Sequence, residues 1–452
     1  MKTVLTIFTL LTSFMASANS IGAVQTDKEI ISEQLEKLGY VFELDKRKPY
    51  EYNLFEFYTL DEYKIREKKL VTLLDDVVRV KCTNCAVLND ENVVFLSIYI
   101  NKVIDNLNLK SLKHLRRLEI KSRTRSGSIS NLKLPNSLIS LDMSAFIKIE
   151  DTRFFNDIPN LKYVAFDDGH IESLDVLKGH HEIEFLRFTG NKIKNIDAVK
   201  NMKKLKVLKI GPDGVERIPE GLLPDSIEEL RPGANLKSLP AKLPENLMHL
   251  GMGSTNMTHT LDLRKSKKLK ILSVGGSSKC KEIGLNIPDS LQELSATRCR
   301  MENIAFPKNT QLKKVDLEIN PIKVIDPPNI YPTVEELSLS NTRISSLDGI
   351  EHFPNLKKLQ LRDCKLLIDI SAIKHLKQLE EVDLSESIAL KDISPLYHLK
   401  NIRIINLEDA ENADVPEDPT IWPNIKEFYP PDHYTHEELR KIDAWVYDRK
   451  KL

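Results

Sequence analysis

Apolar residues recur through this chain at a fixed spacing. They fill the first, fourth and sixth places of a six-residue phrase, as in Leu115-Arg-Arg-Leu118-Glu-Ile120. Fourteen copies of the phrase follow one another at intervals of 20 to 23 residues. They start at Leu115, Leu138, Leu161, Ile183, Leu205, Ile227, Leu247, Leu269, Leu291, Leu312, Val334, Leu356, Leu379 and Ile402. A fixed period of this length predicts a solenoid of stacked repeats.

Within each phrase the alternation of apolar and polar residues has the period of a short strand. We expect strand cores at Leu118–Ile120, Leu186–Phe188, Leu337–Leu339 and their equivalents. Stacked repeats would place these strands in one concave parallel sheet, and the crossover rule for parallel strands predicts a right-handed superhelix. The return segments are too short for long helices, so the convex side should be 3-10 or extended. The predicted fold class is therefore an α/β solenoid of this kind.

Each repeat also carries a turn residue eight places after its start, here called the turn column. Its members are mostly small and polar: Asn191, Asp213, Asn235, Thr255, Ser277, Cys299, Asn320, Thr342, Cys364 and Ser387. A side chain at this position must satisfy buried backbone groups where the chain turns after the strand. Because cysteine is small and a weak donor, it suits the column. We therefore predict that Cys299 and Cys364 are buried and unpaired.

Four regions are expected along the chain. Residues 1–18 read as a signal peptide, with a basic start, an apolar run and Ala16-Ser-Ala18 as the cleavage pattern. Residues 19–92 would form an N-terminal cap region, 93–428 the solenoid, and 429–452 a C-terminal cap. Helices are expected at 27–39, 60–78 and 435–449, and a closing strand at 424–428. No later segment is apolar enough to span a membrane, so the protein should be exported, either secreted or periplasmic.

The repeats resemble those of bacterial leucine-rich-repeat proteins. Leu186-Arg-Phe188-Thr-Gly-Asn191-Lys-Ile193 is similar to the 22-residue repeat of internalins. The Leu-Pro-x-x-Leu elements resemble repeats of secreted effectors such as YopM and the IpaH family. This resemblance covers about residues 93–428, and it implies a protein-binding solenoid, such as a host-interaction factor.

Little in the sequence points to catalysis, a metal or a cofactor. Lysine plus arginine and aspartate plus glutamate both number 66, and this balance argues against a nucleic-acid partner. The IpaH family carries a ubiquitin-ligase domain with a Cys-x-Asp nucleophile, and none of the five cysteines here has aspartate two places later. Cys82 and Cys85 have redox-motif spacing without its structural context. A local disulfide between them is the favoured interpretation, and unpaired thiols are the alternative.

The predicted binding site lies on the concave face, at positions 2, 4 and 6 of successive repeats. Position 2 gives an apolar strip of Tyr163, Phe185 and Val207. Position 4 gives a basic strip of Arg187, Lys209 and Arg231. Position 6 gives a row of glycines: Gly211, Gly233, Gly253 and Gly275. Stacked apolar residues favour a contact surface, and glycine lets another backbone approach or relieves crowding on a curved sheet. This surface suits an acidic and apolar peptide or loop.

A second part of the same face is more acidic. Its residues are Asp316, Glu318, Glu336, Glu381, Asp383 and Glu408, interrupted by Lys314, Lys358 and Arg362. The leading hypothesis is a monomeric, non-enzymatic binding protein for a protein or peptide. The alternatives are an envelope structural or assembly factor, and an enzyme with an unrecognised site in residues 27–92.

Overall fold

The computed structural model describes most of the repeat region and short parts of the N-terminal region. The described residues are 56–59, 73–74, 77–78, 85–89, 92–100, 103–122, 127–143, 148–149, 151–169, 171–211, 214–253, 262–276, 280, 286–308, 310–416 and 421–432. The chain is a parallel-strand β-solenoid of about 14 turns with little helix, as the sequence predicted. It forms two compact units, residues 1–213 and 214–452.

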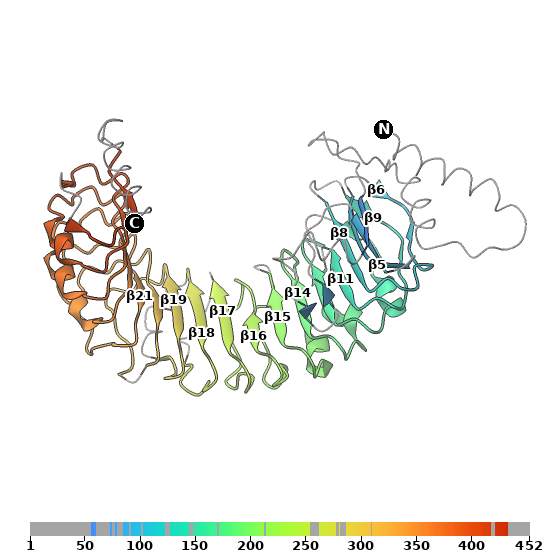
Figure 1. The fold of residues 1–452 in the computed structure, drawn as a ribbon. Coiled ribbons are helices and arrows are strands. Elements are labelled where there is room, and N and C mark those ends of the chain that lie inside the picture. Colours follow the sequence, from blue (N-terminus) through green and yellow to red (C-terminus); the bar gives the residue numbers. More distant parts are fainter. Residues whose placement is uncertain are drawn as a thin grey trace, which may run out of the picture. The chain divides into compact units, whose positions relative to one another are not determined.

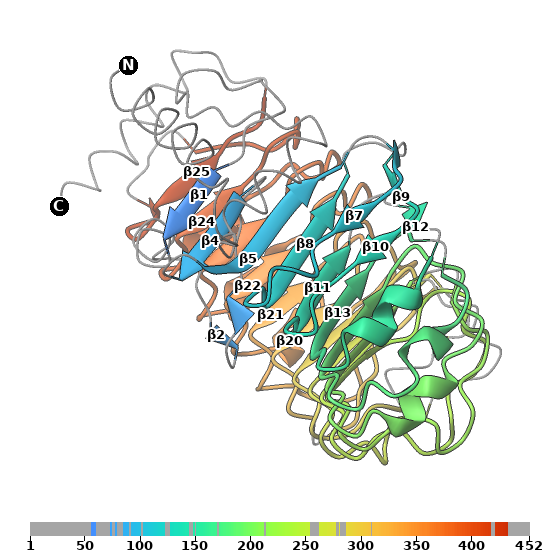
Figure 2. The same ribbon diagram turned by 90° about the vertical axis from the view of Figure 1, so that its right-hand side faces the viewer.

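The first unit stacks its strands in sequence order (Figure 1). The main strands are β4 (Cys85–Asn89), β5 (Asn92–Tyr99), β8 (Arg117–Lys121), β11 (Ser140–Met143), β13 (Tyr163–Phe166), β14 (Phe185–Phe188) and β15 (Val207–Ile210). From β5 onward each strand pairs in parallel with the next, whereas β4 pairs antiparallel with β5 and parallel with β1 (Glu56–Thr59). Figure 2 shows β5, β8, β11 and β13 side by side.

Most of the other elements of the first unit lie in the return segments. Short strands stack there as β6 (Val103–Ile104), β9 (Ser128–Ile129) and β12 (Lys148–Ile149), and as β7 (Leu107–Asn108) with β10 (Leu132–Lys133). Later returns contain the 3-10 turns η1 (Arg153–Asp157), η2 (Leu174–Leu177) and η3 (Asp197–Asn201). The predicted mixture of extended and 3-10 return segments is therefore present.

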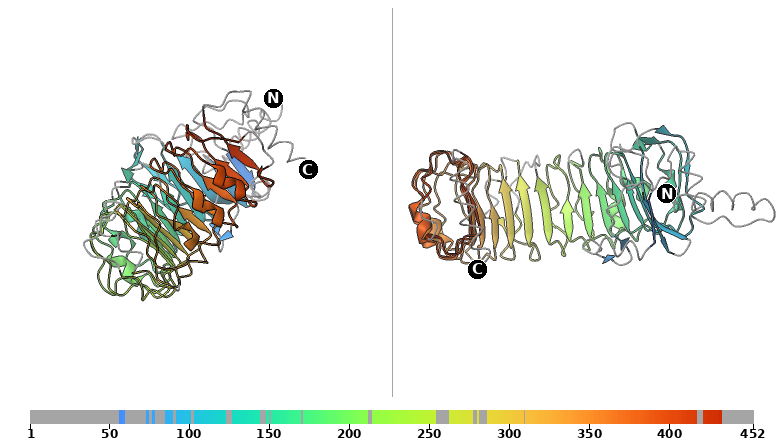
Figure 3. Two further views of the ribbon diagram at one scale, coloured as in Figure 1. Left: turned by 90° about the vertical axis from the view of Figure 1, so that its left-hand side faces the viewer. Right: turned by 45° about the horizontal axis from the view of Figure 1, so that its top comes forward.

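The second unit repeats the same plan. Its strands are β16 (Glu229–Arg231), β17 (His249–Gly253), β18 (Ile271–Gly275), β19 (Glu293–Thr297), β20 (Lys314–Asp316), β21 (Glu336–Ser338), β22 (Lys358–Gln360), β23 (Glu381–Asp383), β24 (Ile404–Asn406) and β25 (Glu427–Tyr429). Each pairs in parallel with the next. The strands coloured light green to yellow lie in this order in the right panel of Figure 3. Its later returns contain η5 (Ile350–His352), η6 (Ser371–His375) and η7 (Ser394–His398).

The core confirms the predicted register of the phrase. Leu118, Leu186 and Leu359 are fully buried, whereas Phe185 and Arg187, on either side of Leu186, are only half-buried. Burying a leucine side chain stabilises the fold by roughly 1.5–3 kcal/mol. Since a shift of one residue would exchange the buried and exposed sets, this repeated stabilisation fixes the register.

Outside the repeats, two sequence predictions have a definite outcome. The helix expected at 60–78 is wrong where the structure describes it, because β2 (Leu73–Leu74) pairs antiparallel with β3 (Val77–Val78). Leucines and valines spaced for a helix face also suit a short hairpin, so the pattern could not decide between them. The closing strand expected at 424–428 is present as β25, which spans Glu427–Tyr429. The signal peptide and the helices at 27–39 and 435–449 lie outside the described residues. Among described residues, no helix is long and apolar enough to cross a membrane.

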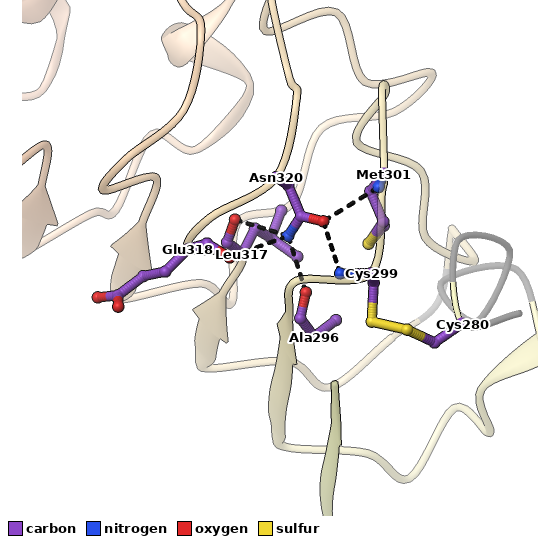
Figure 4. Close-up of a disulfide and its surroundings, with 7 residues drawn as sticks. All are labelled: Cys280, Ala296, Cys299, Met301, Leu317, Glu318 and Asn320. Carbon is purple, nitrogen blue, oxygen red and sulfur yellow. Dashed lines mark hydrogen bonds between the residues drawn. A yellow bond between two sulfur atoms is a disulfide. The ribbon is translucent and has the colours of Figure 1, made fainter. Parts of the chain in front are cut away.

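The turn column works as the sequence predicted. Asn320, which is 2% exposed, donates to the carbonyls of Ala296, Leu317 and Glu318 at 2.8, 2.8 and 3.2 Å. Its Oδ1 accepts from two backbone amides, those of Cys299 and Met301, both at 3.0 Å (Figure 4). One side chain thus satisfies backbone groups of two neighbouring repeats.

Cysteines in the turn column behave differently from one another. Cys364 is buried and unpaired, and its Sγ donates to the Leu339 carbonyl at 3.2 Å. Burial raises the pKa of this thiol. The prediction for Cys299 is wrong, because Cys299 is disulfide-bonded to Cys280 (Figure 4). Cys280 is 19 residues earlier, nearly one repeat, and stacking brings the two Cα atoms to 5.1 Å.

One position before the turn column, the backbone turns left-handed. Ile319, Asn341 and Asp363 there have φ of 56°, 55° and 56°. Asparagine and aspartate tolerate this region, whereas a β-branched residue is an outlier in it. Ile319 is also 39% exposed, so it gains little from packing.

We expect Ile319→Asn to stabilise the protein by about 1 kcal/mol, since left-handed backbone costs an L residue roughly 1–2 kcal/mol. Asn341→Ile should destabilise it by a similar amount, because the same strain is then introduced. Denaturant midpoints of the two variants and the parent chain would check both. Midpoints that move in the same direction would contradict the assignment of strain.

Candidate functional site

Positions 2, 4 and 6 of each phrase share one face of the sheet, here called the open face. In the first unit, this face carries an aromatic stack at position 2. The rings of Tyr163 and Phe185 lie 4.3 Å apart between centroids and are nearly parallel, at 7°. Val207 pairs in register with Phe185 on the next strand. All three side chains are half-buried, so the predicted apolar strip is a real surface feature of this unit.

Lys209 completes the stack from position 4 of β15. Its Nζ lies 5.7 Å from the centroid of the Phe185 ring. A cation at this distance is attracted to the negative face of the ring. The methylene stem and the ring together widen the surface that a ligand could contact.

Arg187 differs from the basic strip expected from the sequence. Its Nη2 lies 2.9 Å from Asp167 and 3.8 Å from Asp142. Asp167 is itself held in place, since the backbone amide of Thr189 donates to it at 3.0 Å. The cation is therefore largely neutralised inside the first unit. Both aspartates stand at positions 4 and 6 of neighbouring phrases, so reading all columns together would have found them.

The four glycines of position 6 do not form one uniform floor. A Cβ at Gly211 would lie 2.3 Å from the backbone nitrogen of Gly190, and one at Gly275 2.7 Å from the carbonyl of Thr297. Gly233 has φ of 95°, which disfavours any other residue. At Gly253 a Cβ would meet nothing within 4 Å. Close strand packing or a turn thus explains three of them.

The open face of the second unit is polar. Arg231, predicted in the basic strip, is exposed and pairs with Glu229 at 2.8 Å. Further along, position 2 alternates in charge through Glu293, Lys314, Glu336, Lys358 and Glu381. Position 4 carries mainly short polar side chains. Opposite charges on adjacent strands stabilise the sheet.

A pocket of about 240 Å³ lies on this face, over β18 to β22. Side chains from positions 2 and 4 of five successive phrases line it. Glu318, from position 6, adds a carboxylate. This hollow was not predicted from the sequence, because the periodic pattern reports which side chains share a face and not how far they rise from it.

No described group of three or more His, Cys, Asp or Glu side chains could hold a metal ion. The adjacent histidines His180 and His181 have different surroundings. His180 is buried, and its Nε2 lies 3.1 Å from the Phe155 carbonyl. Burial lowers the pKa of His180, which favours a neutral, structural imidazole. His181 is exposed. Cys82 lies outside the described residues, and the Cys85 side chain is not described, so the disulfide between them stays a prediction. Most of residues 27–92, where an enzyme site was the alternative hypothesis, also lies outside the described residues.

Two comparisons address the repeats themselves. Residues 329–421 match the family model of the leucine-rich-repeat domain of the endo-beta-N-acetylglucosaminidase EndoS. An uncharacterised leucine-rich-repeat-containing protein of Amsacta moorei entomopoxvirus is 23% identical over 250 residues, covering 53% of this chain. The repeats are leucine-rich repeats. The alignment spans 50% of the viral protein's length.

Solved structures of two other leucine-rich-repeat proteins are similar to this chain at low identity. The functional domain of internalin J from Listeria monocytogenes is 16% identical, with 78% of this chain and 71% of that chain covered and a TM-score of 0.47. Mouse RP105, solved in complex with MD-1, is also 16% identical, with 88% and 79% covered and a TM-score of 0.48. These likenesses concern the fold alone.

Proposed function

We propose that this leucine-rich-repeat chain is a non-enzymatic binding protein whose open face contacts a protein or peptide partner. The observation that carries the proposal is the stack of Tyr163 and Phe185, extended by Val207 and Lys209. Neither aromatic ring belongs to the buried core, which the neighbouring strand residues Val164 and Leu186 fill. Half-exposed aromatics in a contiguous group are the residue types that most often dominate interfaces.

The ion pairs of Arg187 affect which side chains of a partner the stack would favour. Arg187 is ion-paired with aspartates, so the stack is flanked by a near-neutral group instead of a basic strip. We propose a partner that places apolar or aromatic side chains on the stack.

We further propose that the protein is exported and acts on another cell or host. The signal-like residues 1–18 support export, and so does the disulfide between Cys280 and Cys299. Structural disulfides persist in oxidising compartments and are rare in the cytosol. Fractionation of the producing cells, with detection of the mature N-terminus by mass spectrometry, would test this proposal.

The binding proposal predicts that Tyr163→Ala combined with Phe185→Ala weakens the partner complex about 30-fold or more. One interface hot spot is worth roughly 2 kcal/mol, and 1.4 kcal/mol corresponds to tenfold in Kd. Affinity purification with the mature chain would first identify the partner, and calorimetry would then give Kd for each variant. The stack contributes only about 0.5–1.5 kcal/mol beyond burial, so the double variant should remain folded.

Ile330→Ala is the matched control, since Ile330 is 61% exposed and lies outside the sheet. This variant should bind the partner with unchanged Kd. Equal Kd values for the parent chain and the stack variant would move the contact away from the aromatic stack.

A further inference from the structure

The pocket over β18 to β22 has more carboxylates than cations to neutralise them. Both lysines of its lining are already ion-paired: Lys314 with Glu336 at 2.9 Å and Lys358 with Glu381 at 2.5 Å. Asp316 and Glu318 also line the pocket and make no ion pair with any side chain in the described part of the second unit. The pocket lining, with four carboxylates and two lysines, therefore carries net negative charge.

These two carboxylates are held in place by neutral donors. The Oδ2 of Asp316 accepts from the Ser295 hydroxyl at 3.0 Å, and its Oδ1 accepts from the backbone amide of Glu318, also at 3.0 Å. The Oε1 of Glu318 accepts from the Ser338 hydroxyl at 2.9 Å. An ionised carboxylate offers about four acceptor sites, so each retains capacity for a further donor. Figure 4 shows Glu318 pointing away from Asn320 and the disulfide.

The pocket has an apolar side as well. Ile271 lines it at position 2 of β18 and is half-buried. A ligand bound in the pocket could therefore contact Ile271 with a methylene stem.

We propose that this pocket receives an arginine side chain from an extended segment of a partner protein. A guanidinium presents five donors in one plane, which suits two fixed carboxylates better than the point charge of an ammonium does. The aliphatic stem of arginine would cover the apolar side. This inference rests on the proposed function, because it names the chemistry of a partner bound to the open face.

Synthetic probes test the inference without the natural partner. Three fluorescent seven-residue peptides would differ only at their central residue, which is arginine, lysine or citrulline, and would be titrated into the full chain at low salt. Fluorescence anisotropy should show the arginine peptide binding at least about tenfold more tightly than the uncharged citrulline peptide. The lysine peptide should bind with intermediate affinity. Asp316→Asn with Glu318→Gln should weaken the arginine peptide about tenfold or more.

A second double variant controls for general charge attraction. Asp326→Asn with Glu302→Gln also removes one aspartate and one glutamate charge, but from exposed positions outside the pocket lining. This variant should leave the Kd of the arginine peptide unchanged. Equal weakening by both double variants would overturn the pocket assignment, as would failure of the arginine peptide to bind. A lysine peptide that binds as tightly as the arginine peptide would overturn the choice of arginine. These outcomes are independent of the aromatic stack, so the two proposals fail separately.

Discussion

Asn320→Ala is expected to destabilise the second unit by about 3 kcal/mol or more. The substitution removes five hydrogen bonds, and it leaves the buried amides of Cys299 and Met301 without their acceptor. Each buried polar group left unsatisfied costs roughly 1–3 kcal/mol. No new partner is close by, because the side chain is 2% exposed and water has little access to it.

The denaturant midpoint of the full chain would measure this loss. Asn355→Ala is the matched control, since the Asn355 amide is exposed and makes one hydrogen bond, to the Pro332 carbonyl at 2.9 Å. It should shift the stability by about 1 kcal/mol or less. Asn320→Thr should lie between the two, because a hydroxyl has one donor hydrogen where the amide has two. Thr342 in the same column donates its hydroxyl hydrogen to the Leu339 carbonyl. Similar midpoints for Asn320→Ala and Asn355→Ala would contradict the role given to the column.

The periodic part of the fold could be predicted from the sequence because one physical cause acts in every repeat. Leu186 and its equivalents must be buried, and this fixes the strand, the register and the exposed face together. The turn column followed for the same reason, since Asn320 satisfies backbone groups that every copy of the turn leaves over. Where no repeat constrains the chain, as at 73–78, an apolar pattern allowed both helix and hairpin, and the prediction was wrong.

The candidate site was predicted less completely, because it depends on pairs of side chains. Tyr163 and Phe185 were placed together correctly by their shared position in neighbouring phrases. From its column alone, Arg187 is predicted to offer a cation to a ligand, but Asp142 on β11 and Asp167 directly after β13 pair with it and neutralise it. Whether a column of charged residues is available to a ligand can be predicted only together with the charges in the columns beside it. The pocket depends on how far each side chain extends from the sheet, and the repeat pattern does not predict this.

The disulfide of Cys299 could not be predicted for the same reason, since it also depends on a pair of side chains. Its position in the turn column correctly predicted burial, as for Cys364. Its partner, Cys280, belongs to a return segment and not to the column, so a column-by-column reading could not connect them. Only the stacking of one repeat on the next brings the two residues together.

Reduction of the Cys280–Cys299 disulfide should lower the stability by about 3 kcal/mol. The bond closes a loop across 19 residues of sequence, and a loop of about this length restricts the unfolded chain by roughly that free energy. Packing should change little, because Cys364 shows that the turn column accommodates a free thiol with a backbone carbonyl as its partner. The loss therefore arises mainly in the unfolded state.

Denaturation with and without a thiol reductant would separate this effect from others. The parent chain should lose stability on reduction, whereas the double variant Cys280→Ala with Cys299→Ala should be unresponsive at these positions and resemble the reduced parent. Cys364→Ala is the control, since this residue is unpaired and its variant should keep the parent's response to reductant. Rapid thiol labelling of Cys299 in the native, unreduced protein would show that the bond is absent. Slow labelling of Cys364 is expected throughout, because the thiol is fully buried and burial raises its pKa, which disfavours the reactive thiolate.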